Sequence, residues 1–186
     1  DEYDSAFFDK RSKFIHYSPD ILLINNIEFD HADIFNDLDE IKKQFHHLLK
    51  IIPSTGKVIL FNHDRNALDV INEGCWADII KINGDDSSVS FDSSSSMIEF
   101  DGKSECINDL PFYGSHNNLN AAAAIITAAS YGVNLNAAYR GLKDFSGVLR
   151  RLENKGTFKG ITILDDFAHH PTAIKSTIQA VEEEYS

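Results

Sequence analysis

Residues 37–61 read DLDEIKKQFHHLLKIIPSTGKVILF and contain the strongest structural signal in the chain. Apolar residues recur at helical spacing in the first half of this stretch, which predicts an amphipathic helix over 37–50: Leu38, Ile41, Phe45, Leu48 and Leu49. Pro53 and Gly56 end that helix. The continuous apolar run that follows, Lys57–Phe61, is typical of a strand buried on both faces.

The alternation of strand and helix continues on both sides of this stretch. Phe14–Tyr17 and Ile21–Ile24 are short and apolar, and each predicts a strand. Arg65–Glu73 is a predicted helix closed by Gly74, and Asp78–Ile82 is a further predicted strand. This order predicts an α/β fold in which a mainly parallel sheet is flanked by helices.

The middle of the chain has a different pattern. Turn signals at Gly84-Asp85-Asp86, Ser93–Ser96 and Asp101-Gly102 separate runs of a few residues. Short strands joined by tight turns predict a small antiparallel β subdomain over 83–106.

Helices return in the last third. The expected helices are Asn117–Tyr131, Asn136–Lys143 and a final one that starts at Pro171, and the expected strands between them are Arg150–Glu153, Thr157–Phe158 and Ile161–Leu164, around a turn at Gly156. A domain boundary is expected near His170–Pro171. Because the chain begins without Met and ends inside the last predicted helix, we expect it to be a piece of a longer protein.

Composition excludes several classes of function. The 186 residues include 17 Lys and Arg against 29 Asp and Glu, a net charge of −12 that repels a phosphate backbone, so we expect no nucleic-acid partner. The longest apolar runs, Ile21–Ile24 and Ala121–Ala129, are too short to cross a bilayer, so we expect no membrane partner. The opening residues do not have the pattern of a signal peptide, so we expect none, and two cysteines without metal-type spacing, Cys75 and Cys106, suit a reducing cytoplasm.

A first cluster of polar side chains follows the predicted strand Ile21–Ile24, where ligands of open α/β sheets bind. Its sequence over 25–33 is NNIEFDHAD. Three carboxylates and the imidazole of His31 could hold a divalent cation there. An ordinary loop, with Asp33 or Asp37 capping the next helix, explains the same residues.

A second cluster, GSHNNLN over 114–120, opens the alanine-rich helix. Asn117 and Asn120 are three residues apart and so share one helix face, and an asparagine amide matches the N6/N7 edge of adenine. Helix capping by Ser115 or Asn117 is the alternative.

Two further clusters lie near the predicted strands of the last third. Arg150-Arg151 could bind phosphate, although on a strand only one of the two side chains can face a site. The stretch 165–171, DDFAHHP, has carboxylates suited to ribose hydroxyls or a metal and imidazoles suited to proton transfer, unless Asp166 or His170 simply caps the next helix. The sequence contains no Gly-x-x-x-x-Gly-Lys-Ser/Thr phosphate loop.

The order of these clusters along the chain resembles the Mur ligase family, the ATP-dependent amide ligases of peptidoglycan synthesis. The motifs that carry the resemblance are DEYD at 1–4, Asn26-x-x-x-Asp30-His31-x-Asp33, Gly114-x-His116-Asn117-x-x-Asn120, Arg150-Arg151 and DDFAHHPT at 165–172. The resemblance implies that residues 1–170 are the central ATP-binding domain without its phosphate loop. Residues 171–186 would then begin the C-terminal domain or form its linking helix.

The resemblance also assigns roles to residues. It implies catalytic roles for His31, as the contact of Mg²⁺ (or Mn²⁺), and for Arg151, at the nucleotide phosphates. The remaining residues implied for ATP are His116, Asn117 and Asn120 at the adenine, Asp166 at the ribose, and His169 and His170 near the hinge to the C-terminal domain.

Residues 1–14 and 25–35 most resemble the family members that join L-alanyl-γ-D-glutamyl-meso-diaminopimelate to UDP-N-acetylmuramate in cell-wall recycling. In that reaction the muramate carboxylate takes the γ-phosphate of ATP, and the amine of the peptide then displaces phosphate from the acyl phosphate. Members that add L-alanine to the same acceptor are the nearest alternative.

We expect the phosphate loop and a metal-binding glutamate to precede Asp1, so the isolated chain should not catalyse ligation. Two other classes of function stay open: a Mur-like module that binds nucleotide without turnover, and a metal-dependent hydrolase using Asp30, His31 and Asp33.

Overall fold

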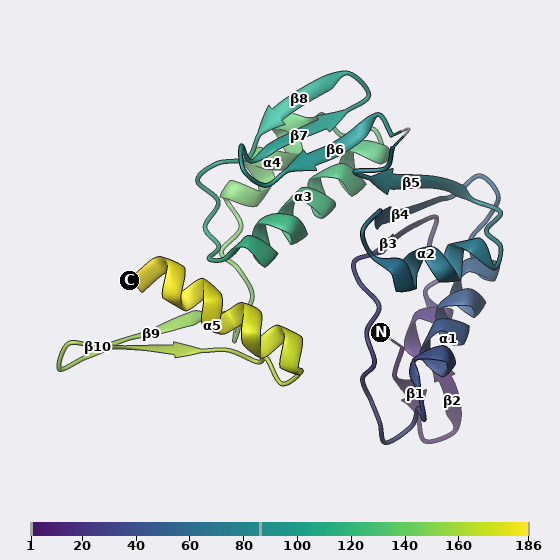
Figure 1. Cartoon of the computed structure of the whole chain (residues 1–186), viewed down its shortest axis with the longest axis horizontal. Coiled ribbons are helices and arrows are strands. Elements are labelled where there is room, and N and C mark those ends of the chain that lie inside the picture. Colours follow the sequence, from purple (N-terminus) through teal and green to yellow (C-terminus); the bar gives the residue numbers. More distant parts are fainter. Residues whose placement is uncertain (1, 86, 186) are drawn as a thin grey trace. The chain divides into compact units, whose positions relative to one another are not determined.

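The computed structural model describes residues 2–85 and 87–185 (Figure 1). Asp1 of the opening motif, Asp86 of a predicted turn and Ser186 at the end of the last predicted segment lie outside the described residues. The chain divides into two compact units, one made of Asp1–Ser90, Glu99–Lys103 and Ser130–Gly132, the other of Phe91–Ile98, Ser104–Ala129 and Val133–Ser186.

A parallel three-stranded sheet is the centre of the first unit. Its strands are β3 (Ile21–Ile24), β4 (Lys57–Phe61) and β5 (Asp78–Ile82), in the order β3-β4-β5 with β4 in the middle. Both pairings are parallel. The predicted α/β fold with a parallel sheet is therefore confirmed, and all three strands have the predicted bounds.

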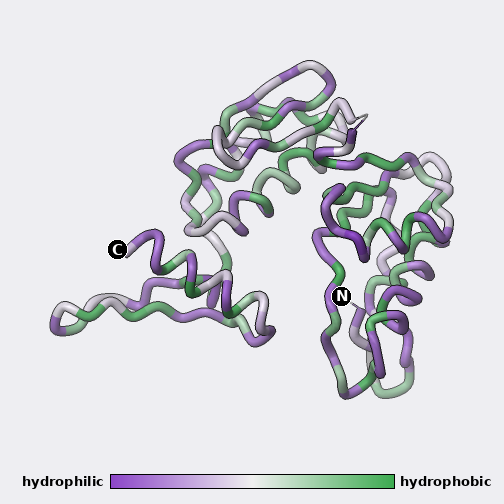
Figure 2. Tube along the Cα trace, in the orientation of Figure 1, coloured by the Kyte–Doolittle hydropathy of each residue, from purple (hydrophilic) through white to green (hydrophobic). Residues whose placement is uncertain are grey.

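Two amphipathic helices pack with this sheet, α1 (Leu38–Ile51) and α2 (Arg65–Asn72). The carboxylate of Asp37 accepts the backbone N–H of Glu40 at 2.9 Å and caps the start of α1. Hydrophobic positions concentrate in the strands and alternate with hydrophilic ones along α1, as Figure 2 shows. The buried residues shared by the sheet and helices form one core: Ile24, Ile27, Phe35, Ile41, Leu49, Ile52, Val58, Leu60, Ala67, Val70, Ile71 and Ala77.

The predicted antiparallel subdomain is also present. It is a three-stranded sheet in the order β6-β7-β8, with β6 (Val89–Asp92), β7 (Met97–Phe100) and β8 (Lys103–Cys106). Two helices follow it, α3 (Ser115–Ser130) and α4 (Leu135–Lys143). The side chain of Asn136 on α4 donates to Glu105 of β8 at 3.2 Å, which ties the helix to the sheet.

The chain ends with an antiparallel hairpin, β9 (Glu153–Phe158) and β10 (Ile161–Asp165), and helix α5 (Pro171–Tyr185). Two predictions were wrong here. Gly156 lies inside β9 and the turn is at Lys159-Gly160, while residues 150–152 precede the strand. Residues 154–156, Asn-Lys-Gly, have no apolar alternation, so the sequence predicted a turn there and a strand only at Thr157–Phe158.

The predicted strand Phe14–Tyr17 is also wrong. Residues Lys13–His16 form a short 3-10 helix, and a hairpin of β1 (Asp4–Ala6) and β2 (Asp9–Ser12) precedes it. Phe14 is buried and packs against Phe45 of α1, with ring centroids 5.1 Å apart. One buried aromatic fixes this segment without a strand partner.

Within the described residues, none of the helices has both the length and the apolar character needed to span a bilayer. The boundary near His170–Pro171 stays a prediction.

Candidate functional site

The loop that carries the first polar cluster is fastened to the start of α2. Ile27 is 2 % exposed, and its N–H donates to Asp64 Oδ2 at 3.0 Å. Its carbonyl accepts from Asn66 Nδ2 at 2.8 Å. The other oxygen of Asp64 accepts the N–H groups of Asn66 and Ala67 and caps α2. One side chain thus anchors both the helix and the loop, a link that sequence analysis missed although Asp64 has the type and place of an N-cap residue.

His31 is held by three neighbours in this loop and at the N-terminus. Its Nε2 lies 3.3 Å from Glu2 Oε1. The ring of Tyr3 meets its imidazole edge-on, with centroids 4.7 Å apart, and the Tyr3 hydroxyl donates to Asp33 Oδ2 at 2.7 Å. That hydrogen bond, together with the charge of Asp33, raises the pKa of Tyr3. His31 has a left-handed backbone, φ +56°, and its N–H donates to the carboxylate of Asp30 at 2.7 Å.

The side chains around His31 could supply only a few ligands to a cation, so water and phosphate oxygens would have to supply the rest. No group of three His, Cys, Asp or Glu side chains in residues 2–85 and 87–185 is placed to hold a metal ion. The hydrolase hypothesis, which needs Asp30, His31 and Asp33 around one metal, therefore lacks support. Glu2 and His31 form one oxygen–nitrogen pair. Mg²⁺ commonly keeps several waters and takes one or two protein carboxylates beside phosphate oxygens, so Glu2 fits that chemistry, whereas the nitrogen of His31 is an unusual ligand for Mg²⁺.

The second cluster lies at the start of α3, which begins at Ser115. Asn117 Nδ2 donates to the carbonyl of Tyr113 at 2.8 Å, and Asn120 Nδ2 lies 3.5 Å from Asn117 Oδ1. The two amides are therefore neighbours on one helix face, as their spacing predicted. The carbonyl of Gly114, not a side chain, accepts the N–H groups of Asn117 and Asn118.

His116 links this cluster to the two that follow it in sequence. Burial lowers the pKa of His116, the negative charges of Asp166 and Glu183 oppose that shift, and the positive charge of Arg151 adds to it. The charges of Asp166, Arg151 and Glu183 all act on this imidazole, although Glu183 is 67 residues from His116 in the sequence. Three predicted nucleotide-binding residues, His116, Arg151 and Asp166, therefore share one electrostatic neighbourhood.

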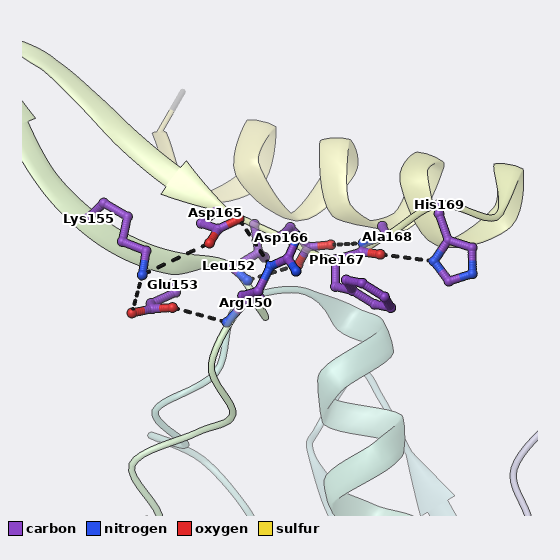
Figure 3. A network of polar contacts seen from close by, with 9 residues as sticks. All are labelled: Arg150, Leu152, Glu153, Lys155, Asp165, Asp166, Phe167, Ala168 and His169. Atoms are coloured by element: carbon purple, nitrogen blue, oxygen red, sulfur yellow. Dashed lines mark hydrogen bonds and ion pairs between the residues drawn. The ribbon is translucent and has the colours of Figure 1, made fainter. Parts of the chain in front are cut away.

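The two arginines have different surroundings. Figure 3 shows Arg150 inside a polar network: its carbonyl accepts from the N–H of Phe167 at 2.8 Å, and its guanidinium lies 4.9 Å from the centre of the Phe167 ring. Its Nε is 3.7 Å from Asp165 Oδ1. Arg151 follows in a bend rather than on a strand, so the argument that a strand would separate the two side chains does not apply.

The turn at residues 150–152 is strained. Arg150 has φ +60° and Leu152 has φ +49°, and a left-handed backbone costs a residue with a side chain roughly 1–2 kcal/mol. Asp166 Oδ2 compensates by accepting the N–H of Leu152 at 2.8 Å (Figure 3).

Asp166 and His170 also make the capping contacts that were the alternative to a functional role. Asp166 Oδ1 accepts the N–H of Ala168 at 2.7 Å and the hydroxyl of Thr177 at 3.2 Å. His170 Nδ1 accepts the N–H of Thr172 at 3.3 Å, at the start of α5. His169 Nδ1 lies 3.0 Å from the carbonyl of Phe167. The side chains of Asp166 and His170 therefore order the loop. The assignment of Asp166 and His169 to a nucleotide stays a prediction.

Residues 3–128 match the Mur ligase middle domain. The chain belongs to the Mur ligase family. It is 44 % identical over 185 residues to the UDP-N-acetylmuramate--L-alanyl-gamma-D-glutamyl-meso-2,6-diaminoheptandioate ligase of Escherichia coli (strain K12), covering 97 % of this chain and 40 % of that protein. To the UDP-N-acetylmuramate--L-alanine ligase of Caldicellulosiruptor bescii it is 36 % identical, covering 91 % of this chain and 39 % of the relative.

A solved structure agrees with this membership. The crystal structure of a murein peptide ligase from Psychrobacter arcticus 273-4 superposes with a TM-score of 0.77 at 38 % identity, over 100 % of this chain and 39 % of that one. The chain therefore spans about two fifths of the length of these Mur ligases.

Proposed function

We propose that this chain is the ATP-binding central part of a cytoplasmic Mur ligase that joins L-alanyl-γ-D-glutamyl-meso-diaminopimelate to UDP-N-acetylmuramate, in peptidoglycan recycling. The observation that carries the proposal is the shared neighbourhood of His116, Arg151 and Asp166 beside the paired amides of Asn117 and Asn120. The higher identity to the tripeptide ligase than to the L-alanine ligase, 44 % against 36 %, supports the choice of substrate.

Each group suits one part of ATP. An asparagine amide both donates and accepts, so Asn117 and Asn120 would read the edge of adenine, with His116 against it. Arg151 would contact the phosphates, because a guanidinium is a permanent cation whose planar donors match phosphate oxygens. Asp166 would accept from a ribose hydroxyl, and His169 lies in the loop beside it.

His31 would contribute one ligand to Mg²⁺, or to Mn²⁺, with Glu2 beside it. A bound divalent cation would neutralise charge on the transferring phosphate. Tyr3 and Asp33 would keep the imidazole in place through the ring contact and the 2.7 Å hydrogen bond.

The proposed reaction is acyl transfer in two steps. An oxygen of the muramate carboxylate bonds to the γ-phosphorus as the bond to ADP breaks, which gives an acyl phosphate. The α-amine of the tripeptide then attacks the acyl carbon, loses a proton, and displaces inorganic phosphate. This chain would contribute by binding and orienting ATP, since positioning supplies much of the rate in phosphoryl transfer.

ATP binding by the full-length protein tests the nucleotide site. The N117A/N120A double variant should weaken ATP binding by at least about tenfold, because each lost bidentate contact is worth about 1–3 kcal/mol. Asn118→Ala is the matched control, since Asn118 is one position along the same helix and off the face that Asn117 and Asn120 share. An unchanged ATP affinity in the double variant contradicts the assignment.

A second measurement separates the classes of function. Phosphate release from ATP should require UDP-N-acetylmuramate and the tripeptide together. Release with L-alanine in place of the tripeptide would indicate the L-alanine ligase. ATP binding without phosphate release with either amine would indicate a non-catalytic module.

A further inference from the structure

We propose that Thr177 and Asp166 are positioning residues for Arg151: through Asp166, helix α5 holds the turn that presents this arginine to the nucleotide phosphates. The inference rests on the proposed ATP site and adds to it a residue, Thr177, that lies on a different element from the nucleotide-binding groups.

The first step is that the turn needs an external support. Arg151 stands between two residues with left-handed backbones, Arg150 and Leu152. Such residues keep that conformation only where their surroundings determine it. Hydrogen bonds fix both sides of Arg151: Phe167 N–H binds the Arg150 carbonyl at 2.8 Å, and Leu152 N–H binds Asp166 at 2.8 Å. The orientation of Arg151 therefore depends on the position of the Asp166 carboxylate.

The second step is that Asp166 is itself fixed by α5. An ionised carboxylate has about four acceptor positions, two on each oxygen. Oδ1 uses both, for Ala168 N–H at 2.7 Å and the Thr177 hydroxyl at 3.2 Å. Oδ2 uses one for Leu152 and retains one, which is enough for the single ribose hydroxyl expected there. The Thr177 hydroxyl therefore fixes the orientation of the Asp166 carboxylate and leaves the remaining acceptor position on Oδ2 for the ribose.

The third step is that Thr177 belongs to a helix face turned toward the nucleotide-binding residues. Ala180, three residues on, is 1 % exposed and packs against Gly114 at the start of the asparagine cluster. Glu183, three residues further, is one of the charges that act on His116. Positions three apart share a helix face. Ile178, the next residue after Thr177, lies off this face and is 53 % exposed.

Thr177→Val tests the link, because valine keeps the shape of threonine and removes the hydroxyl. Ser176→Ala is the matched control: the Ser176 hydroxyl donates at 3.0 Å to the Thr172 carbonyl within the same helix and reaches no loop. Thr177→Ser restores the hydroxyl. Two quantities are measured in the full-length protein: hydrogen exchange at the Leu152 and Ala168 amides, and the affinities for ATP and for adenosine.

We expect Thr177→Val to speed exchange at Leu152 and to weaken ATP binding about threefold to tenfold, the range for one lost hydrogen bond. Adenosine affinity should fall less than ATP affinity, since adenosine has the ribose that Asp166 would contact but no phosphate for Arg151. Thr177→Ser and Ser176→Ala should match the parent in both quantities.

The outcomes separate this inference from the proposed function. If Arg151→Gln weakens ATP binding while Thr177→Val does not, the ATP site stands and the positioning role is wrong. Equal losses for ATP and adenosine in Thr177→Val would also overturn the positioning role. If neither Arg151→Gln nor the N117A/N120A double variant changes ATP affinity, the proposed function itself fails.

Discussion

Gly114 and Ala180 approach so closely that a Cβ added to Gly114 would lie 2.5 Å from the Cβ of Ala180. Gly114 also has a left-handed backbone, φ +87°. Gly114→Ala should therefore destabilise the chain by about 1–3 kcal/mol for overpacking, in addition to roughly 1–2 kcal/mol for the backbone. Urea unfolding at fixed pH measures the change in the free energy of unfolding.

Gly102→Ala separates these two costs. Gly102 has φ +75° and open space where its Cβ would be, so alanine there carries only the backbone cost. Ala180→Gly in the Gly114→Ala background should recover part of the loss, and a double-mutant cycle gives the size of the contact. Equal losses for Gly114→Ala and Gly102→Ala would show that α5 does not pack on Gly114.

The free energy of unfolding of the chain should decrease as the pH is lowered, because of His116. Burial lowers the pKa of His116 in the folded state below its ordinary value of 6.5. The unfolded chain then binds the proton more readily, so the stabilisation is complete above pH 6.5 and is lost as the pH falls through the folded pKa. His116→Gln should flatten the dependence of the unfolding free energy on pH in the window below about 6.5.

His47 has to be separated from this effect, because burial lowers its pKa as well. The His116→Gln variant keeps the His47 contribution, and the His116→Gln/His47→Gln pair removes both. Identical slopes for the parent and His116→Gln would show that His116 is not desolvated.

Local patterns predicted the parallel sheet well because each signal came from one segment. The run Lys57–Phe61 is buried as its composition predicted, and the periodic stretch after Asp37 is the helix α1. The errors fall where burial is decided by distant contacts. In 14–17 Phe14 is the one buried residue, and the strand β9 is paired by β10 despite a glycine inside it.

The candidate site divides in the same way. The Asn117–Asn120 pair follows from helical spacing and was predicted. The contacts of Ile27 with Asp64 and of Leu152 with Asp166 join residues 37 and 14 positions apart, and no local pattern encodes either. Each polar cluster could be found from the sequence, whereas the supports that hold it required the fold.

Asp64 should contribute more to the free energy of unfolding than an ordinary helix-capping residue does. Asp64→Ala removes the cap of α2 and also leaves the buried N–H of Ile27 without its acceptor, so we expect a loss of about 2–4 kcal/mol. Asp37→Ala is the matched control, since Asp37 caps α1 through its bond to the N–H of Glu40, and it should cost about 1 kcal/mol. Chemical unfolding gives both values, and hydrogen exchange at Ile27 reports the loop directly. A cost for Asp64→Ala no greater than that for Asp37→Ala would refute the anchoring of the His31 loop.

Tyr3 should titrate at higher pH than an ordinary tyrosine. Its hydrogen bond to Asp33, and the charge of that carboxylate, raise its pKa above 10.0 by favouring the neutral phenol. The associated stabilisation is complete below pH 10 and is lost as the pH rises through the folded pKa. Asp33→Asn keeps an acceptor but removes the charge, so it should lower the pKa of Tyr3.

The absorbance of tyrosinate, taken as the difference between each protein and its Tyr3→Phe counterpart, isolates this one group. If the pKa of Tyr3 in the parent protein is not above the ordinary value of 10.0, the hydrogen bond to Asp33 is absent, and the ring contact that orients His31 loses its support.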